Sequence, residues 1–151
     1  MRDASLPPDL EPFVRDARVA RLATVDQRGR PHIVPVCFAY QDGFIYSVLD
    51  AKPKRVPVQQ LRRVRNLLAN PNVQLLIDRY DEDWSRLRYI QLRGRASLVE
   101  SGPEHESALA LVRDKYVQYT SMPIDRAPII KIVVEGYVTW TAGQDSPGAV
   151  G

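Results

Sequence analysis

Residues 33 to 49, IVPVCFAYQDGFIYSVL, contain the pattern that decides the fold. Two runs rich in apolar, β-branched and aromatic residues, 33–40 and 44–49, flank the pair Asp42-Gly43. Such a pair between two apolar runs is a strong hairpin signal, because glycine readily adopts the positive φ that a tight turn needs. The sequence therefore predicts two antiparallel strands joined by a tight turn.

Further strands and helices extend outward from this hairpin on both sides. A polar turn, residues 26–30, joins the run 33–40 to an upstream apolar run, and Asn70-Pro71 stops a helix downstream. Gly94, inside a long alternating run, predicts a bulge or a bend. The predicted strands are 19–25, 33–40, 44–49, 73–78, 89–99 and 129–138, and the predicted helices are 6–16, 58–68 and 104–116.

These elements predict a mainly β, α+β domain, in which six antiparallel strands form a small barrel with helices packed on its ends. Residues 1–143 are expected to fold as one domain, and residues 144–151 to be a flexible tail. Side chains fill the interior of a barrel this small. A cofactor is therefore expected on the outside of the barrel or between subunits.

The bulk composition excludes several classes of protein. The chain has 151 residues, of which 44% are hydrophobic, and a formal net charge of +3, which is too weak a bias to indicate nucleic-acid binding. Its one cysteine, Cys37, allows no intrachain disulfide, which fits a reducing compartment. The sequence has neither a signal-peptide pattern nor a long apolar span, so we expect a cytoplasmic protein that does not bind a membrane.

Positive charge is concentrated after the third predicted strand. Between residues 52 and 65 there are six basic side chains and no acidic one: Lys52, Lys54, Arg55, Arg62, Arg63 and Arg65. The segment follows Ser47 near a strand end and runs into a helix, where backbone N–H groups also favour anions. Taken alone, such a run is more often a solvated helix face. In this position it predicts a site for a phosphorylated cofactor.

Metal and nucleophilic chemistry find little support in the sequence. His32, His105 and Cys37 do not have the spacing of metal ligands, and the G-x-S-x-G motif of serine hydrolases does not occur. Both histidines are expected to be structural or solvated.

Aromatic and basic residues around Trp84 and Arg88 are suited to a planar ring system, although aromatic residues are more often part of a core. Residues 115–119, KYVQY, present aromatic and amide groups at a helix end, and interface packing explains them equally well.

Several motifs occur together in a familiar order: RLATVD at 21–26, GRPH at 29–32, KPK at 52–54, LRR at 61–63, NP at 70–71 and WSRLR at 84–88. In this order the chain resembles the pyridoxamine 5′-phosphate oxidase-like flavoproteins over residues 10 to 140. The segments DAKPK at 50–54, YDEDWS at 80–85 and KYVQY at 115–119 are similar to the branch that uses the deazaflavin coenzyme F420.

The resemblance implies a split β-barrel of the FMN-binding type that works as a homodimer, with two cofactor sites between the subunits. In such a protein, the phosphate of the cofactor would be held by Lys52, Lys54, Arg62 and Arg63, with Ser47 nearby. Trp84 and Arg88 match the segment that reaches across from the second subunit in the flavin oxidases. No residue of this chain is expected to act as a nucleophile or a metal ligand.

Two departures from the family pattern bear on the cofactor. Residues 32–37, HIVPVC, lack the two basic phosphate ligands that the oxidases carry on this strand, which disfavours FMN. The last strand ends in Tyr137-Val138-Thr139-Trp140, without the terminal Arg-x-His that binds substrate in true pyridoxamine phosphate oxidases. Oxidation of vitamin B6 is therefore not expected.

The predicted function is F420-dependent hydride transfer to an electron-poor small molecule, such as a quinone or an enone. One alternative is an oxidase or reductase of the same fold that binds FMN. Another is a non-catalytic protein that binds a flavin, haem or another tetrapyrrole. Nucleic-acid binding through residues 52–65 would require a recognition motif that the sequence lacks.

Overall fold

The computed structural model describes residues 6–50, 57, 60–144 and 149–150. Three α-helices are present in this part of the chain, α1 (Glu11–Asp16), α2 (Arg62–Ala69) and α3 (Pro103–Lys115), with two short 3-10 helices, η2 (Trp84–Arg86) and η3 (Val117–Thr120). The strands are β1 (Ala20–Val25), β2 (Pro31–Val36), β3 (Ala39–Gln41), β4 (Phe44–Val48), β5 (Asn72–Arg79), β6 (Arg88–Val99), β7 (Ile129–Thr141) and β8 (Ala149–Val150).

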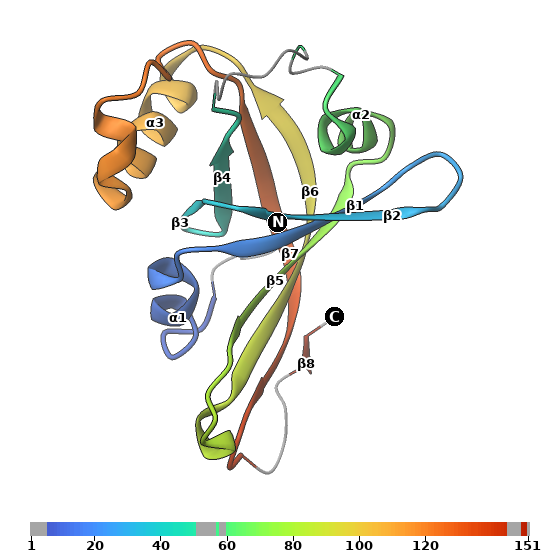
Figure 1. Ribbon diagram of the computed structural model, residues 1–151, viewed down its shortest axis with the longest axis vertical. Helices are drawn as coiled ribbons and strands as arrows, with labels where there is room; N and C mark the ends of the chain where they lie inside the picture. Colours follow the sequence, from blue (N-terminus) through green and yellow to red (C-terminus); the bar gives the residue numbers. More distant parts are fainter. Residues whose placement is uncertain (1–5, 51–56, 58–59, 145–148, 151) are drawn as a thin grey trace.

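All strands belong to one antiparallel sheet that is strongly curled (Figure 1). The strand order is β2-β1-β5-β6-β7-β4-β3, and β8 pairs with β7. The mainly β fold and the split barrel predicted from the sequence are thus confirmed. Among the described residues, however, no ladder joins β2 to β3, so the barrel is not closed by hydrogen bonds.

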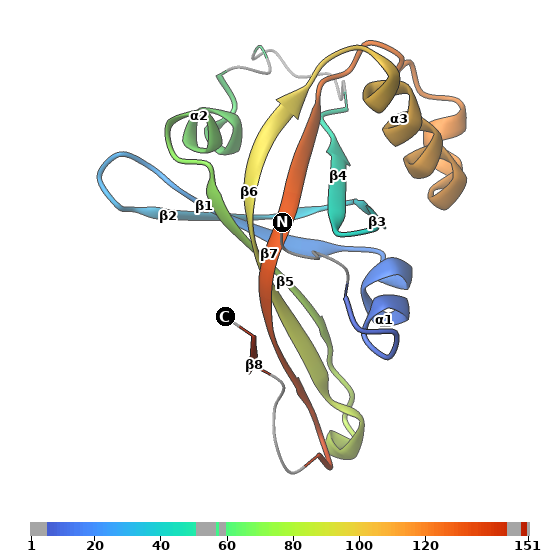
Figure 2. The same cartoon turned by 180° about the vertical axis from the view of Figure 1, so that it is seen from behind.

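The predicted strand 33–40 is wrong in one respect, because it is two strands that lie at opposite ends of the sheet order. The sheet consequently has more than the six strands expected. The connection, here called the Cys37–Phe38 link, consists of two residues between β2 and β3. So short a link forces the two edges of the sheet to lie near each other. Figure 2 shows β2 and β3 as an almost continuous line across the barrel.

Side chains, rather than a neighbouring strand, bond the backbone of this link. The N–H of Phe38 donates to the Tyr116 hydroxyl at 3.0 Å, and Lys115 Nζ donates to the carbonyl of Phe38 at 2.9 Å. Ser47 Oγ donates to the carbonyl of Cys37 at 2.8 Å. Because buried backbone groups need partners, these bonds allow the chain to leave the ladder at this point. Sequence periodicity carries no signal for them.

Two apolar clusters stabilise the domain. The larger fills the barrel and includes fully buried Phe38, Leu22 and Ile45, with Val14 of α1 and Val64 of α2 closing it from outside. The smaller lies between α3 and the outer side of β4, where Val112 packs near Tyr46. The barrel is therefore filled by side chains, in line with the expectation that a cofactor binds elsewhere.

Gly94 lies where β6 bends across β7, as predicted. The β6–β7 register shifts between Arg93 and Gly94. A Cβ at Gly94 would overlap the carbonyl oxygen of Val133 and lie 2.7 Å from Ile132 Cγ2. The close approach of the two backbones thus requires glycine here.

No helix of the described chain is long and apolar enough to cross a membrane. Ala149 and Val150 pair with Val138 and Tyr137. The domain boundary at residue 143, the flexibility of residues 144–151 and the cytoplasmic location stay predictions.

We predict that Gly94→Ala destabilises the domain by roughly 1–3 kcal/mol, because the new methyl group must displace the backbone of β7. Urea unfolding of the variant and the wild type measures this difference. Ser97→Ala, at an exposed position of the same strand, serves as the control. A change below about 0.5 kcal/mol for Gly94→Ala would contradict the close approach.

Candidate cofactor site

The end of β4 carries Ser47, and Asp50 follows just beyond it. Arg63 lies on α2 and Tyr119 on η3. The charge of Asp50 acts on the pKa values of both Arg63 and Tyr119. Segments far apart in the sequence therefore form one electrostatic neighbourhood, here called the β4–α2 site.

Arg63 is the basic residue of this site that is partly withdrawn from solvent. Burial lowers the pKa of its guanidinium, and the nearby carboxylate of Asp50 partly offsets this effect. Its Nε is buried and has no hydrogen-bond partner among the residues that the structure describes. A buried, unpaired cationic donor costs free energy, which an anionic ligand would recover. This observation makes the site fit a phosphate group.

The first turn of α2 reinforces the preference for an anion. Leu61 occupies the N-cap position, and no side chain caps the helix there. The first N–H groups of a helix lack intrahelical partners, and the helix dipole places partial positive charge at this end. Arg62 is exposed beside them. The structure therefore places Arg62 and Arg63 together in the first turn of α2, whereas the sequence predicted a helix from residue 58 that would contain both arginines in its interior.

Ser47 is buried and is not a free donor. Its hydroxyl is committed to the carbonyl of Cys37, although its oxygen still has lone pairs that can accept a bond. In the structure its evident role is to hold the Cys37–Phe38 link. Lys52 and Lys54 lie outside the described residues, so their predicted part in phosphate binding stays a prediction.

Tyr119 is a member of the site that sequence reasoning did not single out. The side chain is buried, and burial is the main cause that raises its pKa, with Asp50 and Cys37 adding to the effect. A tyrosine hydroxyl is protonated at neutral pH and can donate a hydrogen bond, and the raised pKa extends this form to higher pH. The aromatic pattern of residues 115–119 was a signal for it, but packing at an interface explained that pattern equally well.

A groove next to the β4–α2 site carries further positive charge. Its volume is about 330 Å³, and it lies between α2 and the turn that joins β1 to β2. Its arginines are Arg28, Arg30, Arg62 and Arg65. Asp26, the one carboxylate in its lining, is bonded to Arg30 at 2.7 Å, and that bonding lowers the pKa of Asp26 to about 2. The groove, here called the arginine groove, thus carries an excess of positive charge.

His32 lies near the same helix. Its Nδ1 is buried without a hydrogen-bond partner, and it pairs in the sheet with Thr24, whose hydroxyl accepts a bond from Asn66 of α2 at 3.0 Å. The expectation that both histidines are structural or solvated fits His105, which is buried and bonds the carbonyl of Ala127 at 2.8 Å. No sequence motif distinguishes His32 from His105.

Trp84 and Arg88 are far from α2 within one protomer. Both lie on the long hairpin of β5 and β6, whose tip extends away from α2 (Figure 1). Trp84 is 68% exposed at that tip. The guanidinium of Arg88 instead lies over the Phe13 ring, 3.9 Å from its centroid. One chain does not bring these two residues to the β4–α2 site.

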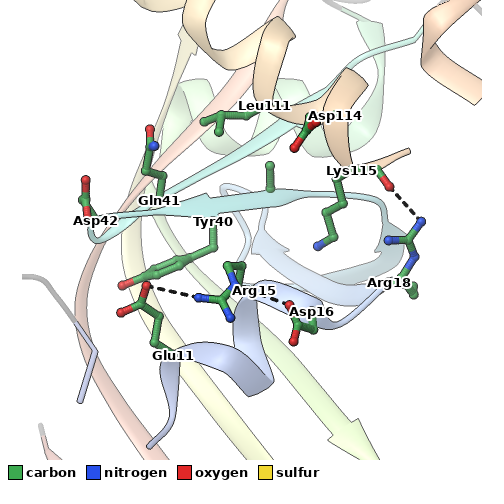
Figure 3. A pocket seen from close by; sticks show the side chains of 11 residues that line it. Glu11, Arg15, Asp16, Arg18, Tyr40, Gln41, Asp42, Leu111, Asp114 and Lys115 are labelled. Carbon is green, nitrogen blue, oxygen red and sulfur yellow. Dashed lines mark hydrogen bonds and ion pairs between the residues drawn. The ribbon is translucent and has the colours of Figure 1, made fainter. Parts of the chain in front are cut away.

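A cavity of about 610 Å³ lies on the other side of the Cys37–Phe38 link, between α1, β3 and the end of α3 (Figure 3). Lys115 projects into it, and burial lowers the pKa of its ammonium to about 8, with the nearby Arg18 adding to the effect. Several carboxylates, including Asp114, also line the cavity. This mixed charge gives the cavity no clear preference for a cofactor phosphate.

No group of three metal-binding side chains gathers in the part of the chain that the structure describes. The binding chemistry of the β4–α2 site rests instead on guanidinium groups, helix N–H groups and a protonated phenol.

Comparison with known proteins shows the family and the fold. A family model described as pyridoxamine 5′-phosphate oxidase matches residues 6–141. A search of curated proteins finds no match. Among solved structures, the chain is similar to the conserved hypothetical protein Rv2991 from Mycobacterium tuberculosis, with 20% identity, coverage of 99% of this chain and 96% of that one, and a TM-score of 0.73.

Two other structures share the fold but differ in the ligands that their names report. One is a FAD-binding protein from Mesorhizobium loti, with 19% identity, coverage of 89% and 94%, and a TM-score of 0.65. The other is HutZ, the haem storage protein from Vibrio cholerae, with 19% identity, coverage of 95% and 96%, and a TM-score of 0.67. At this identity the likeness shows the fold alone.

The lowered pKa of Lys115 predicts a pH dependence of stability. Unfolding returns the pKa to its ordinary value near 10.5, so between about pH 8 and pH 10.5 the unfolded chain binds more protons and stability gained from Lys115 rises with pH. In Lys115→Met this rise is expected to be missing. Urea unfolding of both proteins from pH 7 to pH 10 measures the difference, and parallel pH profiles would contradict the assignment.

Proposed function

The chain belongs to the pyridoxamine 5′-phosphate oxidase family, and on that premise we propose that it is an oxidoreductase that uses the deazaflavin coenzyme F420. The observation that carries the proposal is the buried, unpaired Nε of Arg63 at the uncapped start of α2. Such a group is suited to the anionic end of a phosphorylated cofactor.

The arginine groove favours F420 over FMN. FMN ends at its phosphate, whereas F420 carries further carboxylates beyond it. Arg62 belongs to both the start of α2 and the groove, so an anionic chain held at α2 continues into the groove. Of the groove arginines, Arg30 is neutralised by Asp26, which leaves Arg28, Arg62 and Arg65 for a ligand. A cofactor that stops at one phosphate makes no use of Arg28 and Arg65.

Bound F420 would supply hydride chemistry toward an electron-poor acceptor such as a quinone or an enone. The protein would hold the phosphate with Arg62, Arg63 and the N–H groups of α2. Lys52 and Lys54 remain proposed partners of the same group. Tyr119, which is protonated at neutral pH, would donate a hydrogen bond to negative charge that develops nearby. A proton for the product would come from solvent or from a tyrosine.

A homodimer is part of the proposal, because Trp84 belongs to η2, in the connection between β5 and β6, and the tip of this hairpin lies away from α2 of the same chain (Figure 1). The side chain is 68% exposed, which is unusual for a tryptophan without a partner surface. In a dimer it would cover the cofactor held by the partner chain. Arg88 is less suited to this role, since it lies against Phe13 of its own α1.

Haem or tetrapyrrole binding without catalysis is the second candidate, and the similarity to HutZ is the observation that favours it. Haem needs an axial ligand, for which histidine is the usual choice. His105 is buried and bonded to a backbone carbonyl, and His32 has a buried Nδ1 on β2. Neither histidine is freely presented on an open face, which ranks this candidate below a flavin or deazaflavin.

The first test is cofactor titration of the wild type and of Arg63→Gln. We expect the variant to bind the cofactor at least about tenfold more weakly, because a charge-assisted bond to phosphate contributes roughly 1.5–3 kcal/mol. Calorimetry with F420 and with FMN measures the affinities. Arg95→Gln, an exposed arginine of β6, is the matched control. Equal affinities of the wild type and Arg63→Gln for the cofactor would show that Arg63 does not bind its phosphate.

The second test separates the two cofactors. The double variant Arg28→Gln, Arg65→Gln is expected to weaken F420 at least about fivefold and to leave the affinity for FMN unchanged, since only F420 places anionic groups in the groove. Tight, stoichiometric FMN in protein purified from its native host, together with an unaltered F420 affinity in the double variant, would favour the FMN alternative.

A further inference from the structure

A second pocket with excess positive charge lies between α1 and the hairpin of β5 and β6. Its volume is about 520 Å³. Four arginines and two aspartates line it, together with apolar side chains of α1, of the segment between α1 and β1, and of β5. We propose that this pocket, here called the Arg79–Arg88 pocket, binds a small organic anion with an apolar body, such as an aromatic carboxylate.

The main observation is a pair of like charges in direct register. Arg79 of β5 is paired with Arg88 of β6 across the antiparallel ladder. Like charges directly opposite each other on neighbouring strands destabilise a sheet. This repulsion affects Arg88, because burial lowers the pKa of its guanidinium and the charge of Arg79 lowers it further. An anion between the two guanidinium groups would remove this repulsion.

Arg88 is also left without a partner for a buried donor. Within the described part of the chain its Nε is buried and has no hydrogen-bond partner, while its guanidinium carbon lies 3.9 Å from the centroid of the Phe13 ring. The charge of Asp9 raises the pKa of Arg88, but no ion pair joins these two residues in the part of the chain that the structure describes. The stacking on Phe13 fixes the plane of the guanidinium, so its donors are ordered before a ligand arrives.

The aspartates that line the pocket are already engaged. Asp78 is paired with Arg21 at 3.2 Å, and Asp16 with Arg15 at 3.4 Å. Arg18 is likewise occupied, since it donates to the carbonyl of Lys115 at 2.9 Å. The Nε of Arg79 donates a hydrogen bond to the carbonyl of Arg86 at 2.9 Å. The two terminal nitrogens of the Arg79 guanidinium are therefore left for a ligand.

The apolar part of the lining determines the class of ligand. Phe13, Ala17 and Val19 border the same pocket, and Val19 is 38% exposed. A hydrated inorganic ion would leave these surfaces in water, whereas an aromatic carboxylate would cover them while its charge meets the arginines. The lining therefore favours an amphipathic acid over free phosphate.

This proposal does not depend on F420. The pocket shares no lining residue with the arginine groove, and α1 and α2 lie on different sides of the molecule in both views (Figures 1 and 2). It also gives Arg88 a role different from the cofactor contact predicted from the sequence.

The test compares two probes of the same shape, naphthalene-2-carboxylate and naphthalene-2-carboxamide, by calorimetry on the full chain. We expect the carboxylate to bind at least tenfold more tightly than the amide. Arg88→Gln and Arg79→Gln should each weaken the carboxylate at least tenfold and leave the amide unchanged. Phe13→Leu should weaken both probes by a similar factor. Because Arg79 is exposed, Arg79→Gln is expected to fold, and it tests the proposal even if Arg88→Gln does not fold.

Arg95→Gln, which removes an exposed arginine elsewhere on β6, is the control and should bind both probes like the wild type. Equal affinity for the carboxylate and the amide would overturn the proposal, as would wild-type binding by the folded Arg79→Gln and Arg88→Gln variants. Loss of carboxylate binding in Arg63→Gln would place the probe in the cofactor site and would also overturn it.

Discussion

The architecture depends on the Cys37–Phe38 link, which joins strands at opposite ends of the sheet order. Two residues cannot span a flat sheet of this width, so the sheet must curl until both edges meet. The link itself has no strand partner. Its backbone is bonded by Tyr116, Lys115 and Ser47, and these bonds take the place of the ladder that would close a barrel.

The same bonds tie the link to the candidate site. Ser47 lies near the end of β4, and Tyr116 directly precedes η3, which carries Tyr119. Tyr119 of η3 and Arg63 of α2 each interact electrostatically with Asp50, which lies just beyond β4. The hydroxyls of Ser47 and Tyr116 are committed to the link, whereas Arg62, Arg63 and Tyr119 keep polar groups for a ligand.

Positive charge on this protein is divided between two places that differ in physical character. At α2 and the arginine groove, several cations line an open surface and a helix end, an arrangement suited to an extended anion. At the Arg79–Arg88 pocket, two cations face each other across a ladder beside an aromatic ring, an arrangement suited to a compact acid. The same fold accommodates different ligands, since two structures that share it are described by their names as binding FAD or storing haem. Local charge and shape, rather than the fold, therefore determine the ligand.

The sequence by itself determined the strands, the hairpin at Asp42-Gly43, the bend at Gly94 and the family, because these depend on local periodicity and on residue types at fixed spacing. It also placed Arg62 and Arg63 on a helix, although only the structure shows that this helix begins at Arg62. Only the tertiary structure decided that the strand 33–40 breaks at Cys37, that Ser47 is committed to a carbonyl, and that Arg88 lies on Phe13 far from α2. Each of these outcomes depends on a contact between residues distant in the sequence, and the pattern of a single segment does not report which distant group satisfies a buried donor or acceptor.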